Sequence, residues 1–465
     1  MRKPPGQWSF MDAWWRWGNV VADALLAGNG GPTVIERLQK DRLRRLVQWA
    51  RRASPFYAER YAGLSASRPA RLADLPSVSR AELMARFDDW VTDREVTLAR
   101  VREFVAKPSL VGHPFRDKYA VFSSSGTTGV PGLFVQDADA LAVYDALGTA
   151  RLGALAPLWD WRNSVGGHRY ALIAATGGHF AGVVTWERLR ALHPWFAKNG
   201  IVIPVTDPMD GIARALEAFR PTVIATYPSV LRALAERKEA GELLCAPGAL
   251  WYGGEWLAPE CRRRIERAFG ARVAGDYGAS EFMNIAFECE KGELHVNSDW
   301  VILEPVDERG EPVPAGKPSA NVLLTNLANR VQPFIRYELG DSVTMVPGAC
   351  ACGRHFPRVR VDGRRDEILR FADAKGERIP VMPLALSTAI EEGAGVHRFQ
   401  VEQTGPRRAH LRVEGGGEKT LAKARKALVA WLETQGLPGI AVTAQAGRLA
   451  AHPVSGKFRQ VFRRT

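Results

Sequence analysis

The sequence predicts an α/β protein with a large N-terminal domain of mainly parallel β-sheets and a small α+β domain at its C-terminus. Three observations carry this prediction. The chain has 465 residues, which is too long for one ordinary core. Short apolar runs alternate with amphipathic helices from about Tyr119 onward, and beyond Gly363 a compact strand and helix mixture replaces this alternation. We therefore predict domains of residues 1–361 and 362–465.

Residues 1–70 are predicted to form a helical N-terminal segment. Apolar residues recur at helical spacing within residues 34–64, which also hold an aromatic cluster of Phe56, Tyr57 and Tyr61. Charged and polar residues interrupt the earlier stretch 8–26, so neither a signal peptide nor a membrane span fits it. The five cysteines do not make a disulfide framework, and we expect a cytoplasmic protein.

The α/β alternation follows along the chain. Strands are predicted at 169–176, 201–206, 222–229 and 249–255, and helices at 211–219, 230–240 and 259–269. In the small domain, strands are predicted at 398–404, 409–415 and 440–446 around a helix at 420–435. Helices between successive strands are the connections that a parallel sheet needs.

A net charge of +13 attracts polyanions in general. Residues 361–465 hold 18 Lys and Arg against 11 Asp and Glu, so they carry +7 of this charge. No zinc-finger spacing, RNA-binding aromatic signature or continuous basic arm accompanies the charge. We therefore expect phosphorylated small molecules rather than nucleic acid as ligands.

The sharpest motif is a polar run after the apolar segment Tyr119 to Phe122. Small residues let backbone N–H groups approach an anion, and hydroxyls add donors that can follow phosphate oxygens, so the run favours a phosphate cradle. It lacks the Gly-Lys-Ser/Thr ending of a P-loop, and on its own a polar linker is an equal alternative. Its residues are Ser123, Ser124, Ser125, Gly126, Thr127, Thr128, Gly129, Val130, Pro131 and Gly132.

Further segments follow this run in a fixed order. Each alone has an ordinary explanation, such as a turn or a solvated surface charge. They are Tyr252-Gly253-Gly254-Glu255, Asp276-Tyr277-Gly278-Ala279-Ser280-Glu281, Arg336-Tyr337-Glu338-Leu339-Gly340-Asp341, Gly363-Arg364-Arg365-Asp366-Glu367 and Ser455-Gly456-Lys457-Phe458-Arg459.

Together these segments resemble the adenylate-forming superfamily of acyl-CoA synthetases, peptide-synthetase adenylation domains and luciferases, and within it the phenylacetate-CoA ligase-like branch. The resemblance runs from about residue 35 to the end, and so many ordered segments are improbable by accident. One departure is Gly132, where many members carry Lys. The resemblance implies a large adenylation domain and a small mobile C-terminal domain.

The resemblance also implies nucleotide contacts. The serine, threonine and glycine run holds the phosphates of ATP, and the segment Gly253, Gly254 and Glu255 lies against adenine. The segment Asp276, Tyr277 and Gly278 contacts the nucleotide, with the Tyr277 ring as an aromatic face for the purine. Asp341 accepts hydrogen bonds from the ribose hydroxyls, and Arg364 contacts the nucleotide with its forked guanidinium.

The catalytic residues implied in this way are Lys457, Glu281, Ser280 and Thr127, with Glu281 as a ligand of Mg²⁺. The implied reaction activates a carboxylic acid with ATP to an acyl-adenylate and then forms a thioester with coenzyme A, releasing pyrophosphate and AMP. Two alternatives stay open. One is an acceptor other than coenzyme A, such as a carrier-protein thiol or an amine, and the other is a non-catalytic or nucleic-acid-binding protein that keeps the fold.

The acyl pocket in this family is assembled beside the phosphate loop and the glycine segments. Aromatic and small residues together favour a flat aryl or arylacetic acid over a long acyl chain. A lone histidine such as His179 is more often structural than a substrate contact. The candidate pocket residues are Tyr227, Pro228, Trp251, Ala279, His179 and Phe180.

Cysteine and histidine residues of two segments form a candidate zinc site without a catalytic role. Four soft ligands can close a tetrahedral structural site, and some members of the branch hold zinc at similar Cys-x-Cys-Gly-Arg segments. The spacings are not the usual Cys-x2-Cys, so buried free thiols with a hydrogen-bonded histidine stay an alternative. The favoured ligands are Cys289, His295, Cys350 and Cys352, with His355 in reserve. A homodimer is left open.

Overall fold

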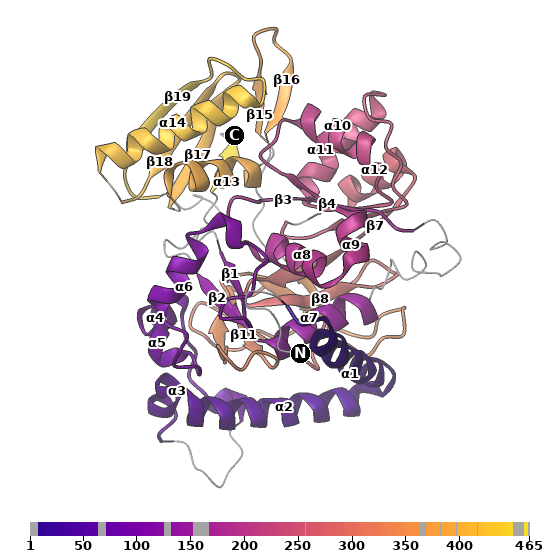
Figure 1. The fold of residues 1–465 in the computed structure, drawn as a ribbon, viewed down its shortest axis with the longest axis vertical. Helices are drawn as coiled ribbons and strands as arrows, with labels where there is room; N and C mark the ends of the chain where they lie inside the picture. The colour runs from indigo at the N-terminus through magenta and orange to yellow at the C-terminus, as the bar shows by residue number, and fades with distance from the viewer. Residues whose placement is uncertain are drawn as a thin grey trace.

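The central sheet of the computed structural model has nine strands in the order β13-β14-β9-β8-β7-β6-β5-β3-β4 (Figure 1). Strands β4, β3, β5, β6 and β7 pair in parallel, and strands β7, β8, β9, β14 and β13 pair antiparallel. The structure describes residues 8–63, 71–124, 132–151, 167–255, 257–361, 369–381, 383–396, 398–415, 417–449 and 460–463.

The helices and strands of these residues have the following bounds. The α-helices are α1 (Phe10–Asn29), α2 (Gly31–Ala53), α3 (Pro55–Arg60), α4 (Arg80–Ala85), α5 (Phe87–Trp90), α6 (Leu98–Val105), α7 (Ala138–Ala150), α8 (Ala181–Leu192), α9 (Pro194–Asn199), α10 (Met209–Phe219), α11 (Pro228–Glu239), α12 (Pro259–Phe269), α13 (Pro383–Ala394) and α14 (Glu418–Thr434). The strands are β1 (Ala120–Ser123), β2 (Leu133–Gln136), β3 (Tyr170–Ala174), β4 (Gly200–Pro204), β5 (Val223–Thr226), β6 (Ala249–Tyr252), β7 (Arg272–Ala279), β8 (Phe282–Glu288), β9 (Leu294–Val296), β10 (Val301–Val306), β11 (Asn321–Asn326), β12 (Tyr337–Glu338), β13 (Val343–Val346), β14 (Arg358–Val361), β15 (Leu369–Ala372), β16 (Arg378–Val381), β17 (Phe399–Gly405), β18 (Arg408–Val413), β19 (Ala441–Ala446) and β20 (Val461–Arg463).

The parallel half of the central sheet confirms the predicted α/β alternation. Helix α12 has the predicted bounds, because Pro259 suits the first helical turn and Gly270 ends the helix with a φ of +60°. Helices α10 and α11 each begin two residues before their predicted starts. The antiparallel half was not predicted, since the short strands β8, β9, β13 and β14 lie between the motif segments rather than between helices.

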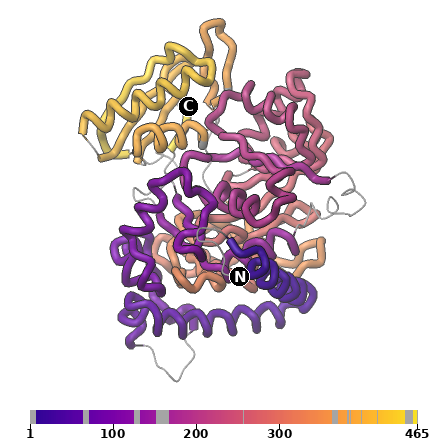
Figure 2. Tube along the Cα trace, in the orientation of Figure 1, coloured from indigo at the N-terminus to yellow at the C-terminus, as the bar shows by residue number. Residues whose placement is uncertain are grey.

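The segment of residues 1–70, predicted to be helical, contains α1, α2 and α3, although apolar residues at helical spacing were recognised only from residue 34 onward. Helix α1 packs against α7, and α2 and α3 follow it along one end of the molecule, opposite the C-terminal strands (Figure 2). Ser9 caps α1 by accepting from the Asp12 N–H, and Ser54 caps α3 by accepting from the Tyr57 N–H. No helix of the described ranges is long and apolar enough to cross a membrane.

The last part of the chain folds as a four-stranded sheet, β19-β18-β17-β20, with α13 and α14. The predicted face of α14 is buried through Ala424, Leu428 and Leu432. Apolar residues of this sheet and these helices join those of the parallel strands β3 to β7 in one continuous cluster. The small C-terminal unit therefore packs over the parallel half of the central sheet (Figure 1).

Candidate active site

The two ends of the predicted phosphate loop are held together by a hairpin. Strands β1 and β2 pair antiparallel, with Ser123 opposite Leu133. The Ser124 N–H donates to the Gly132 carbonyl at 3.0 Å, and the Gly132 N–H donates to Ser124 Oγ at 3.1 Å. The Ser123 N–H donates to the His179 carbonyl at 2.7 Å, which ties the hairpin to the predicted acyl segment. Ser125, Gly126, Thr127, Thr128 and Gly129 lie outside the described residues.

The departure at Gly132 has a local steric reason. A Cβ at this position would lie 2.3 Å from the ring of Phe134 and 2.9 Å from Ser124 Oγ. Phe134 is fully buried, so its ring cannot move aside cheaply. A lysine at residue 132 therefore requires a different packing of β2.

Three predicted segments meet because they follow neighbouring parallel strands. Tyr227 follows β5, Gly253 follows β6, and Asp276 lies within β7, so all reach the carboxyl edge of the sheet, where ligands of open α/β sheets bind. The Gly253 N–H donates to the Thr226 carbonyl at 3.2 Å. Gly254 has a φ of +77°, and a Cβ there would lie 3.3 Å from the Tyr227 ring, so this tight turn needs glycine.

Glu255, a predicted nucleotide contact, has a structural function in this fold. Its carboxylate accepts from the Ser229 N–H at 2.8 Å and from the Ser229 hydroxyl at 2.9 Å. Ser229 lies in the first turn of α11, whose N-terminal N–H groups need acceptors. Glu255 thus caps α11 and fixes the turn at Gly253 and Gly254 against Tyr227 and Pro228.

Asp276 is a buried carboxyl group beside the glycine turn. A Cβ at Gly253 would lie 2.9 Å from Asp276 Oδ1, so the two segments are in close contact. Burial raises the pKa of Asp276 to about 7, although a hydrogen bond with the side chain of Trp251 acts in the opposite direction. The charge of Asp276 therefore changes near neutral pH.

Tyr277 and Asp341 are brought together although 64 positions separate them. The Tyr277 hydroxyl donates to Asp341 Oδ2 at 2.7 Å. Burial and the neighbouring Asp341 carboxylate raise the pKa of Tyr277 well above its usual value, so the hydroxyl keeps its proton. The predicted purine face and the predicted ribose acceptor thus lie side by side. Gly278 is also constrained, since a Cβ there would lie 2.0 Å from the Met283 carbonyl oxygen.

Glu281 is buried and bound by two residues that the motif analysis did not assign to the site. Its Oε1 accepts from the Tyr337 hydroxyl at 2.7 Å and pairs with Arg80 Nη2 at 3.1 Å. Arg80 Nε also donates to the Tyr337 hydroxyl oxygen at 2.9 Å, which closes a network of three side chains. The exposed fractions of Glu281 and Tyr337 are 2% and 1%. Both contacts use Oε1, so they hold the carboxylate without occupying Oε2.

The backbone around Ser280 and Glu281 is held equally well. The Ser280 carbonyl accepts from Gln136 Nε2 at 3.0 Å, and the Glu281 carbonyl accepts from Asn326 Nδ2 at 2.7 Å. Tyr337 could have been found from the sequence, since it lies in the quoted segment ending at Asp341. Arg80 gave no such signal, because it starts a short helix in a segment without a motif.

The predicted acyl residues divide into two groups. Tyr227, Pro228, Trp251 and Ala279 lie at the ends of β5, β6 and β7. His179 is 1% exposed, its Nε2 lies 3.2 Å from the Lys107 carbonyl, and its ring packs on Phe104, so its imidazole serves the packing of α6. Burial lowers the pKa of His179, which keeps the ring neutral.

The small C-terminal unit touches the predicted acyl segment and the parallel sheet. Glu392 Oε1 accepts from the Gly177 N–H at 2.9 Å. Trp431 Nε1 and Gln435 Nε2 both donate to the Thr206 carbonyl, at 3.0 and 2.9 Å. These contacts fix one orientation of the unit. Arg364 and Lys457, the predicted residues of this part of the chain, lie outside the described residues.

The four predicted zinc ligands converge, with their ligand atoms within 4.8 Å of one another. The Sγ atoms of Cys289 and Cys350 are 3.9 Å apart, and Cys352 Sγ lies 3.4 Å from His295 Nε2. Tetrahedral zinc with Zn–S of about 2.3 Å and Zn–N of about 2.0 Å needs about 3.8 Å between sulfurs and about 3.5 Å between sulfur and nitrogen.

The far side of His295 also fits a metal ligand. Its Nδ1 lies 2.8 Å from the Phe356 carbonyl, an arrangement that turns Nε2 toward the three sulfurs and suits a metal-binding tautomer. His355, the reserve ligand, is exposed and is not part of the cluster. The donor set and its spacing therefore fit zinc. The site lies at the end of β8, whereas Glu281 directly precedes the start of the same strand.

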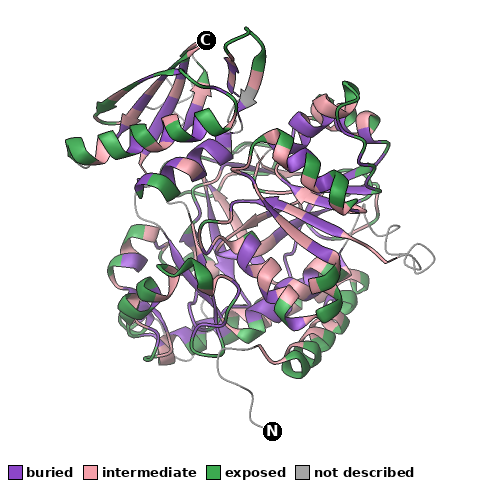
Figure 3. Cartoon of the chain, turned by 45° about the horizontal axis from the view of Figure 1, so that its top comes forward, coloured by how far each residue is buried: buried purple, intermediate pink, exposed green. Residues whose placement is uncertain are grey.

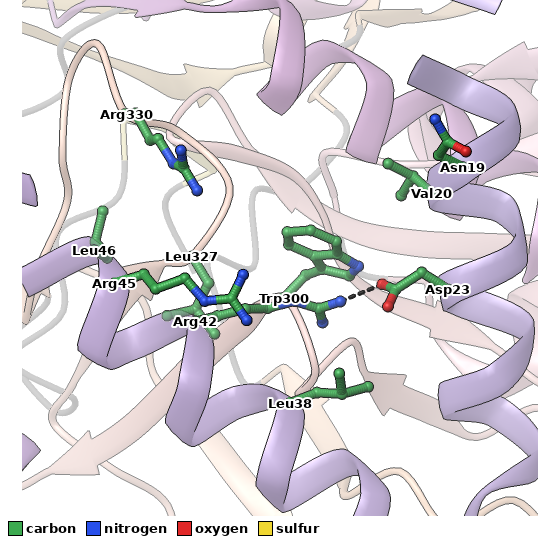
Figure 4. Close-up of a pocket in the computed structure, with 10 residues that line it drawn as sticks. All are labelled: Asn19, Val20, Asp23, Leu38, Arg42, Arg45, Leu46, Trp300, Leu327 and Arg330. Carbon is green, nitrogen blue, oxygen red and sulfur yellow. Dashed lines mark hydrogen bonds and ion pairs between the residues drawn. The ribbon is translucent and has the colours of Figure 1, made fainter. Parts of the chain in front are cut away.

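A separate surface groove lies between α1, α2 and Trp300 (Figure 4). Its volume is about 270 Å³, and Arg42 lies over the Trp300 ring at 3.5 Å while pairing with Asp23. None of the predicted site residues lines this groove.

The chain is similar to several known proteins. A family model described as AMP-binding enzyme matches residues 64–324, which is more than half of the chain. The phenylacetate-coenzyme A ligase of Thermus thermophilus is 29% identical over 398 residues, covering 82% of this chain and 81% of the relative. The phenylacetate-coenzyme A ligase of Escherichia coli is 28% identical over 274 residues, covering 55% of this chain and 57% of the relative.

The fold is that of a solved acyl-CoA ligase. The 2-hydroxyisobutyryl-CoA ligase, in complex with 2-HIB-AMP and CoA in the thioesterification state, has a TM-score of 0.59 and 22% identity and covers 94% of this chain and 91% of its own. These findings confirm the resemblance and the fold class predicted from the sequence. The chain belongs to the AMP-binding enzyme family, and its relatives support the phenylacetate-coenzyme A ligase-like branch of that family.

Proposed function

We propose that this protein activates a carboxylic acid with ATP to an acyl-adenylate and transfers the acyl group to coenzyme A. The observation that carries the proposal is the 2.7 Å hydrogen bond between Tyr277 and Asp341 at the carboxyl edge of the sheet. It joins an aromatic face for a purine to an acceptor for a vicinal diol, beside the turn at Gly253 and Gly254. Membership of the family and the CoA ligase relatives support the same reaction.

The first half-reaction is an attack of the substrate carboxylate on the α-phosphorus, with pyrophosphate leaving on the opposite side. The residues of the hairpin loop between Ser123 and Gly132, including Thr127, hold the phosphates with N–H and hydroxyl donors. Ser280 adds a hydroxyl donor beside them. Mg²⁺, held by Glu281, would neutralise charge on the phosphoryl oxygens.

Arg80 and Tyr337 are positioning residues for Glu281 in this scheme. Their contacts hold Oε1 from the protein side and keep the carboxylate facing in one direction. A group fixed before substrate binds costs no reorganisation during the reaction. Lys457 and Arg364 complete the proposal, with Lys457 stabilising charge on the α-phosphate and Arg364 contacting the nucleotide.

The second half-reaction requires coenzyme A to reach the carbonyl of the adenylate. We assign residues 362–465 to a small domain that rotates between the two half-reactions. Rotation has to break the contacts of Glu392 with Gly177 and of Trp431 with Thr206. The charge of +7 on residues 361–465 suits a polyphosphorylated thiol donor.

The acid is proposed to be an aryl or arylacetic acid. Tyr227, Trp251 and Ala279 offer aromatic and small surfaces at the strand ends, and a flat ring buries well against them. The phenylacetate-coenzyme A ligase of Thermus thermophilus supports this class of acid. Zinc at the cluster of Cys289, His295, Cys350 and Cys352 would supply a structural crosslink between two segments.

The test measures carboxylate-dependent ATP–pyrophosphate exchange across a panel of aryl, arylacetic and fatty acids, followed by thioester formation with coenzyme A or a phosphopantetheinylated carrier. We expect exchange with aryl or arylacetic acids and thioester formation with coenzyme A. Lys457→Ala should nearly abolish exchange and spare thioester formation from supplied acyl-adenylate. Absence of exchange with every acid would refute the proposed function.

A further inference from the structure

The first helix carries an apolar face that points to solvent. Helix α1 buries Ala24 and Ala27 against the body of the protein, where it packs on α7. On the opposite side, Met11 and Trp15 are 70% and 73% exposed. Figure 3 shows this exposed side on the outside of the molecule. The exposed large apolar side chains of α1 are Phe10, Met11, Trp14, Trp15, Leu25 and Leu26.

Apart from Asn29 at the C-terminal end, the polar residues of α1 do not share this face. Asp12, Arg16, Asn19 and Asp23 recur at helical spacing on a separate stripe beside the groove of Figure 4, where Asp23 pairs with Arg42. Arg16 pairs with Asp139. Helix α1 therefore has a buried apolar face, a polar stripe and a second apolar face, and a helix that is apolar on two sides is usually covered on both.

The second apolar face has the spacing of a seam between two helices. Its centre line runs through Met11, Trp15, Gly18, Ala22 and Leu25, with intervals of four and three residues. Large residues lie at both ends of this line, and the small residues Gly18 and Ala22 lie at its middle. Small residues at a crossing point let two helix backbones approach closely.

We propose that α1 binds α1 of a second copy of this chain, antiparallel, about a two-fold axis through the middle of the helix. Such an axis places Gly18 opposite Ala22 of the partner subunit, and Trp15 opposite Leu25 of the partner subunit. A two-fold interface must be complementary to itself, and this pattern pairs small residues with small and aromatic with aliphatic ones. The proposal does not depend on the proposed function.

The available area is sufficient for a stable dimer. From their exposed fractions, and about 150–250 Å² for each large side chain, the six apolar residues expose roughly 700 Å². Two copies would then bury at most roughly 1,400 Å², and stable interfaces bury about 1,200–2,000 Å². A membrane surface fits less well, because no basic residue lies on the face and its centre is made of small residues.

Gly18 provides a test that leaves the subunit intact. A Cβ at Gly18 has no atom within 4 Å, so Gly18→Arg does not disturb the folded chain. Gly211 is the matched control, since it lies in another helix, α10, with equally open space. Sedimentation velocity of the full chain should show a dimer whose Kd rises at least about 100-fold in Gly18→Arg, because an unpaired charge would be buried at the crossing. Gly211→Arg should change the Kd by less than about threefold.

Gly18→Leu distinguishes binding of a second copy from binding to a membrane. A leucine adds apolar surface, so it would strengthen adsorption to a bilayer, but it keeps the two helix backbones apart and should weaken the dimer. A wild-type chain that stays monomeric at all concentrations would overturn the proposal, as would a dimer unaffected by Gly18→Arg. Binding of monomers to phosphatidylglycerol vesicles that increases in Gly18→Leu would assign the face to a membrane instead.

Discussion

Tyr337→Phe tests whether the network around Glu281 orients the carboxylate for adenylation. The substitution removes the 2.7 Å hydrogen bond to Glu281 Oε1 and leaves Arg80 Nε without its acceptor. The ring itself stays packed against Phe334, so no cavity is formed. The change is therefore confined to the hydroxyl.

The magnitude follows from the burial of the partners. A hydrogen bond to a charged group contributes about 1.5–3 kcal/mol, and Glu281 is 2% exposed, so water cannot replace the lost donor. Expressed as a rate, this free energy corresponds to a loss of about 10- to 100-fold. We expect this loss in ATP–pyrophosphate exchange, with a higher Mg²⁺ concentration needed for half of the maximal rate.

Two measurements separate positioning from stability. Thioester formation from supplied acyl-adenylate should stay within about threefold of wild type, since Glu281 has a part only in the first half-reaction of the proposed function. Tyr57→Phe is the control, because Tyr57 is equally buried and donates to the Pro333 carbonyl at 3.0 Å, away from Glu281. Its free energy of unfolding should fall while its Mg²⁺ dependence stays unchanged. If Tyr337→Phe lost only stability and kept the wild-type Mg²⁺ dependence, the network would be structural and the reasoning wrong.

Three further predictions concern the rest of the site. Because burial raises the pKa of Asp276 to about 7, the KM for ATP should change between pH 6 and pH 8, and this change should vanish in Asp276→Asn. The same pKa shift lowers the free energy of unfolding by up to about 1.4 kcal/mol per pH unit as the pH rises from about 4 to 7. Urea titrations at several pH values can measure this decrease. Removal of zinc by a chelator, or Cys350→Ser, should lower the melting temperature with little effect on the Km for the acid, and a metal content near zero in protein purified without added zinc would contradict the zinc site. Glu392→Ala removes an exposed contact with the Gly177 N–H, so it should change the ratio of the two half-reaction rates by about two- to fivefold. Glu433→Ala on the same unit should leave this ratio unchanged. An equal effect of both variants would show that the Glu392 contact does not control the balance of the two half-reactions.

Local patterns determined much of this protein from the sequence alone. The spacing of apolar residues and the turn residues between them located strands β3, β4, β5 and β6 and helices α10 and α11, and Pro259 and Gly270 defined both ends of α12. Gly253 and Asp276 were both predicted as nucleotide contacts, and the structure brings them together because β6 and β7 are neighbouring parallel strands. The four candidate zinc ligands were also grouped from the sequence, because their residue types are rare and soft, and the structure places their ligand atoms within 4.8 Å of one another.

Contacts between distant segments were decided only by the tertiary structure. Arg80 reaches Glu281 across 201 positions, and nothing in its own segment marks it. Glu255 stands in a nucleotide motif, yet it caps α11, because only the fold shows which N–H groups lie near its carboxylate. Helix α1 lies within the segment predicted to be helical, but no helical period was recognised in its own residues, since apolar residues occupy two of its faces and obscure a single period. Sequence determines local conformation through neighbouring residues, whereas burial and long-range pairing depend on how the whole chain packs.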